Sequence, residues 1–347
     1  MNKFTILGET GSGKTCYLLG MYFEMTMGVA GYNILTPNHD EDKNLTLRYS
    51  MLNDKKRGAS RFPAPSDSVQ KYNFKLQYAF KTILPFEWVD YPGGYLDPAQ
   101  NAPDSEQYKQ VAQNIKESST LFICIDGTNL CGSDTEMKIN NVRRNSALYI
   151  VPYLGRFEGK LPPIAMVITK YDLCKNDTNP SEIKEIIEEV FTGLFLRDDV
   201  FVAIIPVSLG ATLQDDNYSG ELEPLNVHLP ILMGINFALI DEMEAARRLI
   251  RSIDNDISIA QRYRDKEADR FSWFRDDDYI YRKEKEIAAS KEEQERIRSN
   301  AKYFKSSLAK VNQKMSAIDM IFANGVWQDN KSIHRMWEKL QSVTKHF

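Results

Sequence analysis

Eight residues near the N-terminus have the types and spacing of a phosphate-binding loop. Residues 8–15 read Gly-Glu-Thr-Gly-Ser-Gly-Lys-Thr, which satisfies the pattern G-x-x-x-x-G-K-[S/T]. Glycines let backbone N–H groups turn towards phosphate oxygens, the lysine places a charge on the outer phosphates, and the threonine hydroxyl can coordinate Mg²⁺. An apolar run precedes the pattern and a helix-like run follows it, which argues against an ordinary turn. The expected nucleotide contacts are Gly8, Thr10, Gly11, Ser12, Gly13, Lys14, Thr15 and Cys16.

A second pattern indicates which base is bound. Thr169-Lys170-Tyr171-Asp172 ends an apolar run and matches [N/T]-K-x-D. An aspartate can accept hydrogen bonds from N1 and N2 of guanine, which adenine cannot supply, while the stem of Lys170 lies over the base. Losing two such bonds, each worth roughly 1.5–3 kcal/mol, would disfavour ATP by about a hundredfold or more. Ser208 and Leu209 follow a further apolar run and could contact the guanine carbonyl; because Leu209-Gly210 departs from the usual S-A-K, this assignment rests on position.

The metal ligands are predicted from two further segments. Asp90-Tyr91-Pro92-Gly93 has the pattern D-x-x-G, in which the Asp90 carboxylate holds Mg²⁺ through water and the Gly93 N–H contacts the γ-phosphate. A simple strand-to-turn exit is the alternative. A second hydroxyl ligand besides Thr15 would come from Ser66 or Ser68, for which ordinary loop capping is the alternative. Thr36 lies too far upstream of the next predicted strand to be preferred.

Together, and in this order, these motifs resemble those of the P-loop GTPases of the Ras-like (TRAFAC) class over residues 1–250. Within that class the chain is most similar to divergent bacterial and archaeal GTPase-like proteins that carry a long segment between the first helix and the second strand. The resemblance implies an α/β fold with a mostly parallel sheet flanked by helices, and a site for Mg²⁺ and GTP or GDP at the strand ends. It also implies two mobile loops that read the γ-phosphate.

Two departures from the class pattern bear on hydrolysis. Thr10 stands where Ras-like proteins have a glycine, which would narrow the space for an arginine supplied by a partner. Gly94 stands where many relatives have the glutamine that orients the attacking water. We therefore expect intrinsic GTP hydrolysis at or below about 10⁻³ s⁻¹, and we assign no catalytic residue.

Two functions remain open from the sequence. The leading hypothesis is a GTP-binding molecular switch with slow Mg²⁺-dependent hydrolysis, in which the nucleotide changes the order of residues 31–70 and 90–102 and thereby controls a protein partner. The alternative is a nucleotide-stabilised scaffold or assembly subunit with little or no hydrolysis, in which a C-terminal helical extension is the working part.

Composition sets limits on both hypotheses. A chain of 347 residues with 42% hydrophobic and 27% charged residues predicts two globular units, a G domain over 1–250 and a helical extension over 251–347. A net charge of −4 gives no reason to expect nucleic acid as a partner. The four cysteines lack zinc spacing, and we find no signal peptide and no apolar run of the ~18–20 residues that span a bilayer. We therefore expect a cytoplasmic protein with reduced thiols.

Alternating apolar runs and amphipathic segments predict the order of the elements. The inserted segment 31–70 should contain a helix of its own near Asp42–Leu52. Strands are expected near 3–7, 71–81, 84–90, 120–126, 163–169 and 201–207, and helices near 14–28, 103–118, 134–150, 181–196 and from 228 onward.

The C-terminal quarter has a heptad pattern, with apolar residues spaced alternately four and three apart. It predicts a helical hairpin that turns near Asp276–Asp278, followed by a short helix that carries Ile333, Trp337 and Leu340. The hairpin is expected to form a coiled coil, by itself or with another chain in a homo-oligomer; helices that simply cover the sheet are the alternative. The residues of the pattern are Ile297, Ala301, Phe304, Leu308, Val311, Met315, Ile318 and Phe322.

Aromatic residues gather near the proposed turn, in Phe271-Ser272-Trp273-Phe274. Local packing or a contact with a protein partner is the preferred interpretation. A membrane contact is disfavoured because the neighbouring Asp276–Asp278 would be repelled by anionic lipid.

Overall fold

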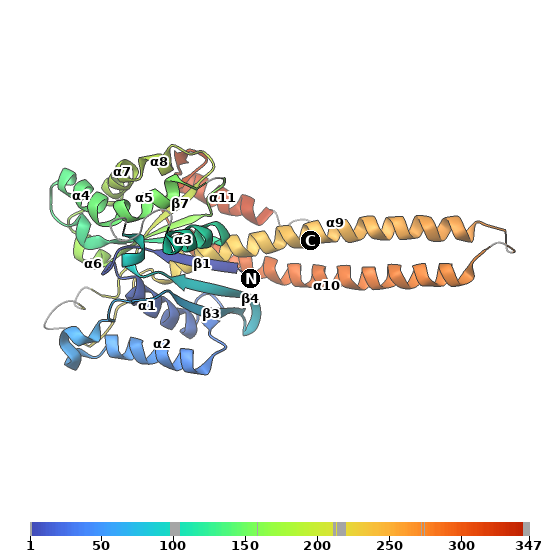
Figure 1. The fold of residues 1–347 in the computed structure, drawn as a ribbon, viewed down its shortest axis with the longest axis horizontal. Helices are drawn as coiled ribbons and strands as arrows, with labels where there is room; N and C mark the ends of the chain where they lie inside the picture. The colour runs from blue at the N-terminus through green and yellow to red at the C-terminus, as the bar shows by residue number, and fades with distance from the viewer. Residues whose placement is uncertain are drawn as a thin grey trace. The chain divides into compact units, whose positions relative to one another are not determined.

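The computed structural model describes residues 2–97, 105–157, 159–210, 213, 220–271, 273 and 275–342. The chain divides into two compact units. Unit 1 comprises Met1–Ala238 and Val311–Arg335, and unit 2 comprises Leu239–Lys310 and Met336–Phe347. Figure 1 labels the helices α1–α11 and the strands β1, β3, β4 and β7. The bounds of all described elements are β1 Asn2–Leu7, α1 Lys14–Met27, β2 Tyr32–Leu35, α2 His39–Leu52, η1 Lys55–Arg61, β3 Gln70–Tyr78, β4 Lys81–Asp90, η2 Gly93–Leu96, α3 Glu106–Glu117, β5 Thr120–Asp126, η3 Gly127–Leu130, α4 Thr135–Val142, η4 Arg143–Ala147, α5 Leu148–Gly155, β6 Ile164–Thr169, α6 Tyr171–Cys174, α7 Pro180–Val190, α8 Thr192–Phe195, β7 Phe201–Pro206, α9 His228–Ala268, α10 Asp277–Met315, β8 Met320–Ala323, β9 Val326–Trp327 and α11 Asn330–Ser342.

Unit 1 contains a mixed sheet in which the described strands have the order β2-β3-β4-β1-β5-β6-β7-β8-β9. The strands from β4 to β7 in this order pair in parallel, and the pairs at both edges are antiparallel. The register places Ile6 beside Asp90 and Asp126 beside Thr169. Because parallel strands end at the same edge of a sheet, the segments that follow β1, β4, β5, β6 and β7 gather there, which is where ligands bind in such folds.

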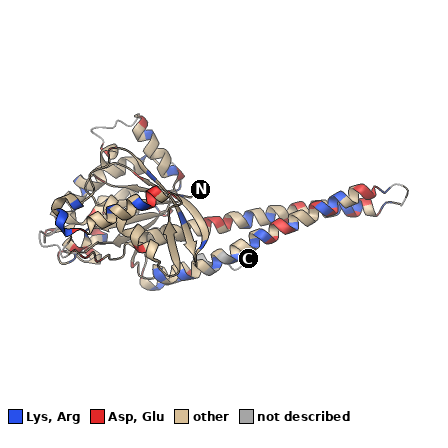
Figure 2. Ribbon diagram, turned by 90° about the horizontal axis from the view of Figure 1, so that it is seen from below, with Lys and Arg blue, Asp and Glu red and all other residues tan. Residues whose placement is uncertain are grey.

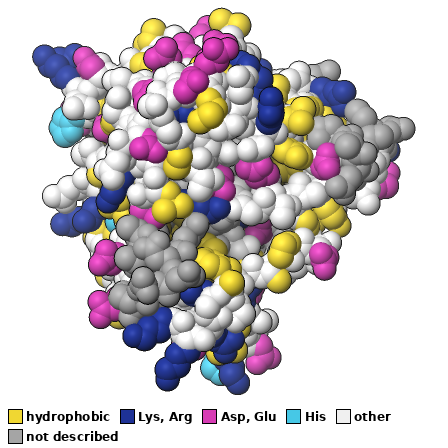
Figure 3. Space-filling model, turned by 90° about the vertical axis from the view of Figure 1, so that its left-hand side faces the viewer, with side chains coloured by type: hydrophobic (Ala, Val, Ile, Leu, Met, Phe, Trp, Pro, Cys, Tyr) yellow, Lys and Arg dark blue, Asp and Glu magenta, His cyan; other side chains and the backbone are white. Residues whose placement is uncertain are grey.

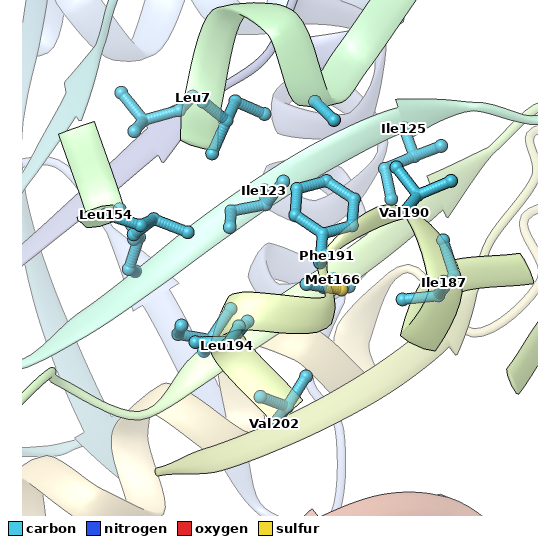
Figure 4. Packing of buried hydrophobic residues seen from close by; sticks show 14 of the residues in the cluster. Leu7, Ile123, Ile125, Leu154, Met166, Ile187, Val190, Phe191, Leu194 and Val202 are labelled. Carbon is cyan, nitrogen blue, oxygen red and sulfur yellow. The ribbon is translucent and has the colours of Figure 1, made fainter. Parts of the chain in front are cut away.

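The central strands are apolar because helices cover both faces of the sheet. Every residue of β5 and β6 is buried, as expected for parallel strands between two helical layers. On one face, α3, α5, α7 and α8 pack onto the strands in the large core that Figure 4 shows from close by. On the other face, the rings of Phe4 and Phe86 lie 4.9 Å apart, and a Cβ added to Gly234 at the start of α9 would lie 3.2 Å from Phe122.

Unit 2 contains the antiparallel arms of a helical hairpin, formed by the parts of α9 and α10 that belong to it (Figure 1). Ile257, Ala260 and Ile287 form a small apolar cluster between the arms, and the Gln294 amide donates to Asp254 over 2.5 Å. Figure 2 shows that acidic and basic residues are closely interspersed along both helices. The predicted turn is confirmed, since α10 begins at Asp277 and Asp276 accepts a hydrogen bond from the Tyr279 N–H over 2.8 Å.

The heptad prediction is wrong at its C-terminal end. The helix α10 stops at Met315, and Phe322 lies in β8, where it pairs with Val202 of β7. Two residues with positive φ, Asn324 at 53° and Gly325 at 75°, then form the turn into β9. Because β8 continues the sheet of unit 1, a strand pairing replaces the last turn of the expected coiled coil. The short helix that follows is confirmed as α11, in which Ile333 and Trp337 are buried; the side chain of Leu340 lies outside the described residues.

Several other predictions differ from the structure. The predicted helix 134–150 is divided into α4, a π-helical turn (η4) and α5, and the edge strand β2 was not predicted. Packing within the chain does not hold for the aromatic residues of the hairpin turn, because Phe271 is 84% exposed and Trp273 is 92% exposed. Ser272 and Phe274 lie outside the described residues. In the described part of the chain, we find no helix with the length and apolarity needed to span a membrane.

Candidate functional site

The loop 8–13 ends at the start of α1 in a conformation that favours glycine. Gly11 and Gly13 have φ angles of 84° and 86°, in the left-handed region that other residues rarely adopt. Gly13 is the N-cap of α1 and provides no side-chain cap. By contrast, side chains cap the first turns of α2, α3, α4 and α7, through Asn38, Ser105, Asp134 and Asn179. The N–H groups at the start of α1 are therefore left available to an anionic ligand.

Lys14 is a buried charge that lies against this loop. Its ammonium group donates to the carbonyl oxygens of Gly8 over 2.8 Å and Glu9 over 2.9 Å, and only 8% of the residue is exposed. Burial lowers the pKa of Lys14, and the nearby Asp90 carboxylate acts in the opposite direction. A cation held in this way is stabilised further when anionic phosphate oxygens replace the neutral carbonyls as its neighbours.

The end of β6 supports the loop from the side of the sheet. The Thr169 hydroxyl donates to the Ser12 carbonyl over 2.6 Å. Lys170 donates to the Gly11 carbonyl over 2.9 Å and forms an ion pair of 2.5 Å with Asp126, at the end of β5. Two of the residues predicted to bind the base, Thr169 and Lys170, are thus hydrogen-bonded directly to residues predicted to bind the phosphates.

Asp90, the last residue of β4, and Gly93, shortly after it, face the same loop. Asp90 is 3% exposed; burial raises its pKa to about 6, against the opposing effect of Lys14 and Arg48. A Cβ added to Gly93 would lie 2.1 Å from the Thr10 amide nitrogen. Any side chain at position 93 would therefore collide with the backbone of the phosphate loop, which gives a steric reason for glycine in this D-x-x-G pattern.

Asp172, Ser208 and Leu209 form the other end of the site. Burial raises the pKa of the Asp172 carboxyl, and a hydrogen bond from Ser208 acts in the opposite direction. Ser208 is held by two backbone hydrogen bonds to Leu225. The Leu209 side chain packs onto α1, where a Cβ added to Gly20 would lie 2.4 Å from it. The leucine that departs from the S-A-K pattern therefore packs against the helix that follows the phosphate loop.

A single cavity of ≈ 380 Å³ brings the predicted residues together. Gly8, Ser12 and Ser68 are not among the residues that line it. The first two act within the loop, where Ser12 Oγ donates to the Glu9 carbonyl over 2.8 Å, and the exposed Ser68 accepts a hydrogen bond from Gln70 over 3.0 Å. The predicted residues that line the cavity are Thr10, Gly11, Gly13, Lys14, Thr15, Cys16, Ser66, Asp90, Gly93, Thr169, Lys170, Asp172, Ser208 and Leu209.

The structure adds residues that sequence reasoning missed. Phe62, Pro63, Leu213 and Val227 give the cavity an apolar wall, and no motif predicted their positions. Asp126 could have been found, because it ends an apolar run as Asp90 does. On the face of the molecule that Figure 3 shows, acidic and basic side chains are interspersed over the described part of the surface.

The donor groups of the cavity fit Mg²⁺ bound together with a phosphate. Among the described residues, no three His, Cys, Asp or Glu side chains are grouped as a metal cage. The cavity offers the Thr15 hydroxyl and the Asp90 carboxyl. Mg²⁺ commonly keeps several waters and takes only one or two protein ligands beside substrate phosphates, so this small set suits that ion.

Comparisons with known proteins leave the family of this chain open. No family model matches it, and no curated protein matches it. Among solved structures, the chain is similar to the GTPase-like domain of S. cerevisiae Ski7, whose structure was determined bound to GTP, with 15% sequence identity and a TM-score of 0.32. The similarity covers 62% of this chain and 44% of the Ski7 chain. The matched region therefore spans less than half of the length of that Ski7 chain. The mixed α/β sheet is consistent with a P-loop GTPase-like fold.

Proposed function

We propose that this protein is a GTP-binding molecular switch with slow, Mg²⁺-dependent hydrolysis. The observation that supports this most directly is the single cavity that collects the phosphate loop, Asp90, Gly93 and the Thr169–Asp172 turn. These segments come from distant parts of the sequence, and each has a predicted role for a different portion of a guanine nucleotide. A coincidence of unrelated turns would not place them around one cavity.

The phosphate end of the site is the loop 8–15. The backbone N–H groups of the loop and of the start of α1 would bind the phosphate oxygens, and Lys14 would neutralise the outer phosphates. Thr15 and Asp90 would hold Mg²⁺, with Ser66 as a further hydroxyl because it lines the cavity. Ser68 is the weaker candidate, since it is exposed and does not line the cavity.

The base end of the site is the turn after β6. The Asp172 carboxylate would accept hydrogen bonds from guanine, and the backbone near Ser208 and Leu209 would contact the base carbonyl. Lys170 is fixed beneath the phosphate loop by its bonds to Gly11 and Asp126, so its aliphatic stem is held in place at this end of the cavity. The half-burial of Asp172 strengthens the discrimination of guanine from adenine. If adenine were bound, the carboxylate would have no partner, and an unpaired carboxylate costs more free energy in this partly buried position than in water.

Hydrolysis is proposed to be slow because the chain lacks the usual water-positioning group. Position 94 is a glycine in η2, which offers no side-chain donor or acceptor. Lys14 and Mg²⁺ would still stabilise charge on the phosphates, so the rate is expected near that of other GTPases before activation, at or below about 10⁻³ s⁻¹. A partner protein that supplies the missing group would accelerate it.

Switching is proposed to act through the segments 31–70 and 90–102, of which residues 98–102 lie outside the described residues. Phe62 to Ser66 and Asp90 to Gly93 line the cavity, so both segments would touch the nucleotide. The output would be a changed affinity for a protein partner, bound by these segments or by the hairpin of unit 2. We retain as a proposal the division into a G domain (1–250) and a C-terminal extension (251–347) that is mainly helical. Two strands of that extension, β8 and β9, join the sheet of unit 1 at its edge.

The test is to measure which nucleotide binds and what it changes. Nucleotide released from the purified protein is identified by ion-exchange chromatography, and the Kd values for GTP, GDP and ATP are measured by calorimetry with and without Mg²⁺. Lys14→Ala and Thr15→Ala should abolish tight binding in a folded protein. Lys43→Ala, on α2 and away from the cavity lining, is the matched control. Tight GTP binding without hydrolysis or any GTP-dependent conformational difference would favour the scaffold alternative, and no preference for GTP over ATP would refute the guanine assignment.

A further inference from the structure

Arg61 is a buried cation at the end of η1, in the segment inserted between α1 and β3. Only 6% of the residue is exposed. Its guanidinium group donates to the Gly58 carbonyl over 3.0 Å and also to the carbonyl of Leu213. Burying a guanidinium group is costly unless its donors are satisfied, and these two carbonyl oxygens accept hydrogen bonds from both terminal nitrogens of Arg61.

The contact with Leu213 joins two segments that are 152 positions apart in the sequence. Phe62, immediately after Arg61, lines the nucleotide cavity, and so does Leu213. The Arg61 guanidinium also lies over the Phe62 ring, 5.0 Å from its centroid, at a distance at which a cation and an aromatic face attract each other. Arg61 therefore fixes two parts of the cavity wall at once.

A second contact supports the same pairing of segments. A Cβ added to Gly220 would lie 3.5 Å from the Lys55 side chain, at the start of η1. Both ends of η1 are thus close to described residues that follow β7, Leu213 and Gly220. Val207 and Ser208 follow β7 directly, and Ser208 lines the same cavity as Asp172, so the contacts of η1 lie towards the base end of the cavity.

The side chains that meet there are suited to a flat apolar group. Phe62, Pro63, Leu209 and Leu213 line the cavity, and none of them can hydrogen-bond a phosphate through its side chain. Phosphate binding is served by the loop 8–15 instead. The chemistry of this wall matches a purine ring.

We propose that Arg61 is a positioning residue that fastens the inserted segment to Leu213, after β7, and so retains the base of the nucleotide. This inference rests on the proposed guanine-nucleotide function. The proposal gives the inserted segment a specific role. Ser66, a candidate metal ligand, lies five positions after Arg61 in the sequence and lines the cavity together with Phe62 and Pro63. Contact at the base end would then be coupled to the position of Ser66 at the metal end.

The test separates the base from the phosphates by using two kinds of probe. Affinities for GTP, GDP and inorganic tripolyphosphate are measured for the parent, Arg61→Met and Arg61→Lys. Arg61→Met should weaken GTP and GDP by the same factor, about 10- to 100-fold, mainly through faster release. Tripolyphosphate affinity should change by less than about twofold. Arg61→Lys, which keeps the charge but cannot donate in the same fork, should be intermediate.

Arg57→Met is the matched control, because Arg57 lies in the same η1 segment, is exposed and pairs with Asp54 over 3.4 Å. It should bind all three probes like the parent. Hydrogen exchange of residues 55–66 should accelerate in Arg61→Met and not in Arg57→Met. Unchanged GTP affinity in Arg61→Met, or an equal loss for tripolyphosphate, would overturn the assignment. A parent that binds tripolyphosphate but shows no preference for GTP over ATP would instead refute the guanine-nucleotide function and the inference with it.

Discussion

Thr169 donates its hydroxyl hydrogen to the carbonyl oxygen of Ser12 over 2.6 Å, although the residues are 157 positions apart. The same hydroxyl lies 3.2 Å from the Ile125 carbonyl at the end of β5. A Cβ added to Gly13 would also lie 3.2 Å from Thr169. The phosphate loop, β5 and the turn after β6 therefore meet at one buried side chain, and a change there should disturb both ends of the proposed nucleotide site.

Thr169→Val tests this connection with little change in shape. The valine cannot donate to Ser12, so a buried carbonyl loses its partner, and we expect the free energy of unfolding to fall by about 1–2 kcal/mol. GTP affinity should fall several-fold because the loop is less well fixed. Thr169→Ser keeps the hydroxyl and should behave like the parent in both measurements. Denaturant unfolding and calorimetry provide the two readouts, and a Thr169→Val protein with parental values in both would show that the bond has no role.

Asp172→Asn should change the preferred base. The amide presents a donor where guanine also has donors, so GTP affinity should drop by about a hundredfold, while xanthosine triphosphate, which carries an acceptor there, should bind more tightly. Competition between the two nucleotides in one titration measures the change. If the variant retained its ordering of GTP over xanthosine triphosphate, Asp172 would not be the residue that reads the base.

The stability of the protein should depend on pH through Glu9. Burial raises the pKa of this carboxyl to about 7, while a hydrogen bond from Asn129 acts to lower it. A carboxyl whose folded pKa is raised destabilises the fold when ionised, so the penalty develops as pH rises from about 4.5 to about 7 and is fully present above that range. Glu9→Gln should therefore raise the melting temperature by roughly 2–4 °C at pH 8. The difference should shrink as pH falls towards 4.5; a constant difference would contradict the assignment.

The positions of several candidate site residues were predictable from the sequence where the proposed chemistry requires a fixed residue at a fixed spacing. Glycines with positive φ, the lysine of the loop and the aspartate at the end of β4 follow from local rules, and the structure places all of them around one cavity. Arg61 and Phe62 could not be predicted in this way. Their positions depend on contacts with a segment about 150 positions away, and no local pattern encodes such a contact.

The end of the helical pattern shows a different kind of failure. Ile318 and Phe322 continue the heptad spacing, which by itself predicts that the helix extends through both residues. The dipeptide Asn324-Gly325, between two short apolar runs, is a strong local signal of a hairpin and was available in the sequence. In the predicted helix 134–150, the sequence pattern likewise did not indicate the π-helical turn η4. A single wider turn inside a helix leaves the residue composition of the segment unchanged.

A buried ion pair between α4 and α7 should matter for stability. Lys138 is 1% exposed and donates to Glu182 over 2.8 Å and to the Asp177 carbonyl over 2.6 Å. Removing one partner leaves the other charge without compensation, so Lys138→Met should cost about 2–4 kcal/mol, somewhat less than a fully buried pair because 19% of the Glu182 side chain is exposed. Lys138→Met combined with Glu182→Leu should recover part of this loss. Additive losses in the double variant would mean that the pair is not coupled.

The pair should also make a contribution that depends on pH. Burial tends to raise the pKa of Glu182, but hydrogen bonds from Lys138, Thr135 and Thr178 outweigh it and the pKa is lowered. A lowered carboxyl pKa stabilises the fold above the unfolded value of about 4.3, and this contribution is lost as pH falls through the folded value. The destabilisation caused by Glu182→Gln should therefore be larger at pH 7 than at pH 3, as measured by denaturant unfolding.

The remaining heptad positions predict how the C-terminal helices are stabilised. Leu308 and Val311 are fully buried within the single chain, so no second chain is needed to cover them. Replacing both by aspartate would bury two charges, and we expect the monomer to lose about 4 kcal/mol or more of stability. Lys310→Asp, at an exposed position between them, is the matched control for charge alone. Sedimentation and thermal unfolding distinguish the outcomes: conversion of an oligomer into a folded monomer would place the contact between chains, and a double variant with parental mass and melting temperature would contradict the burial of both residues.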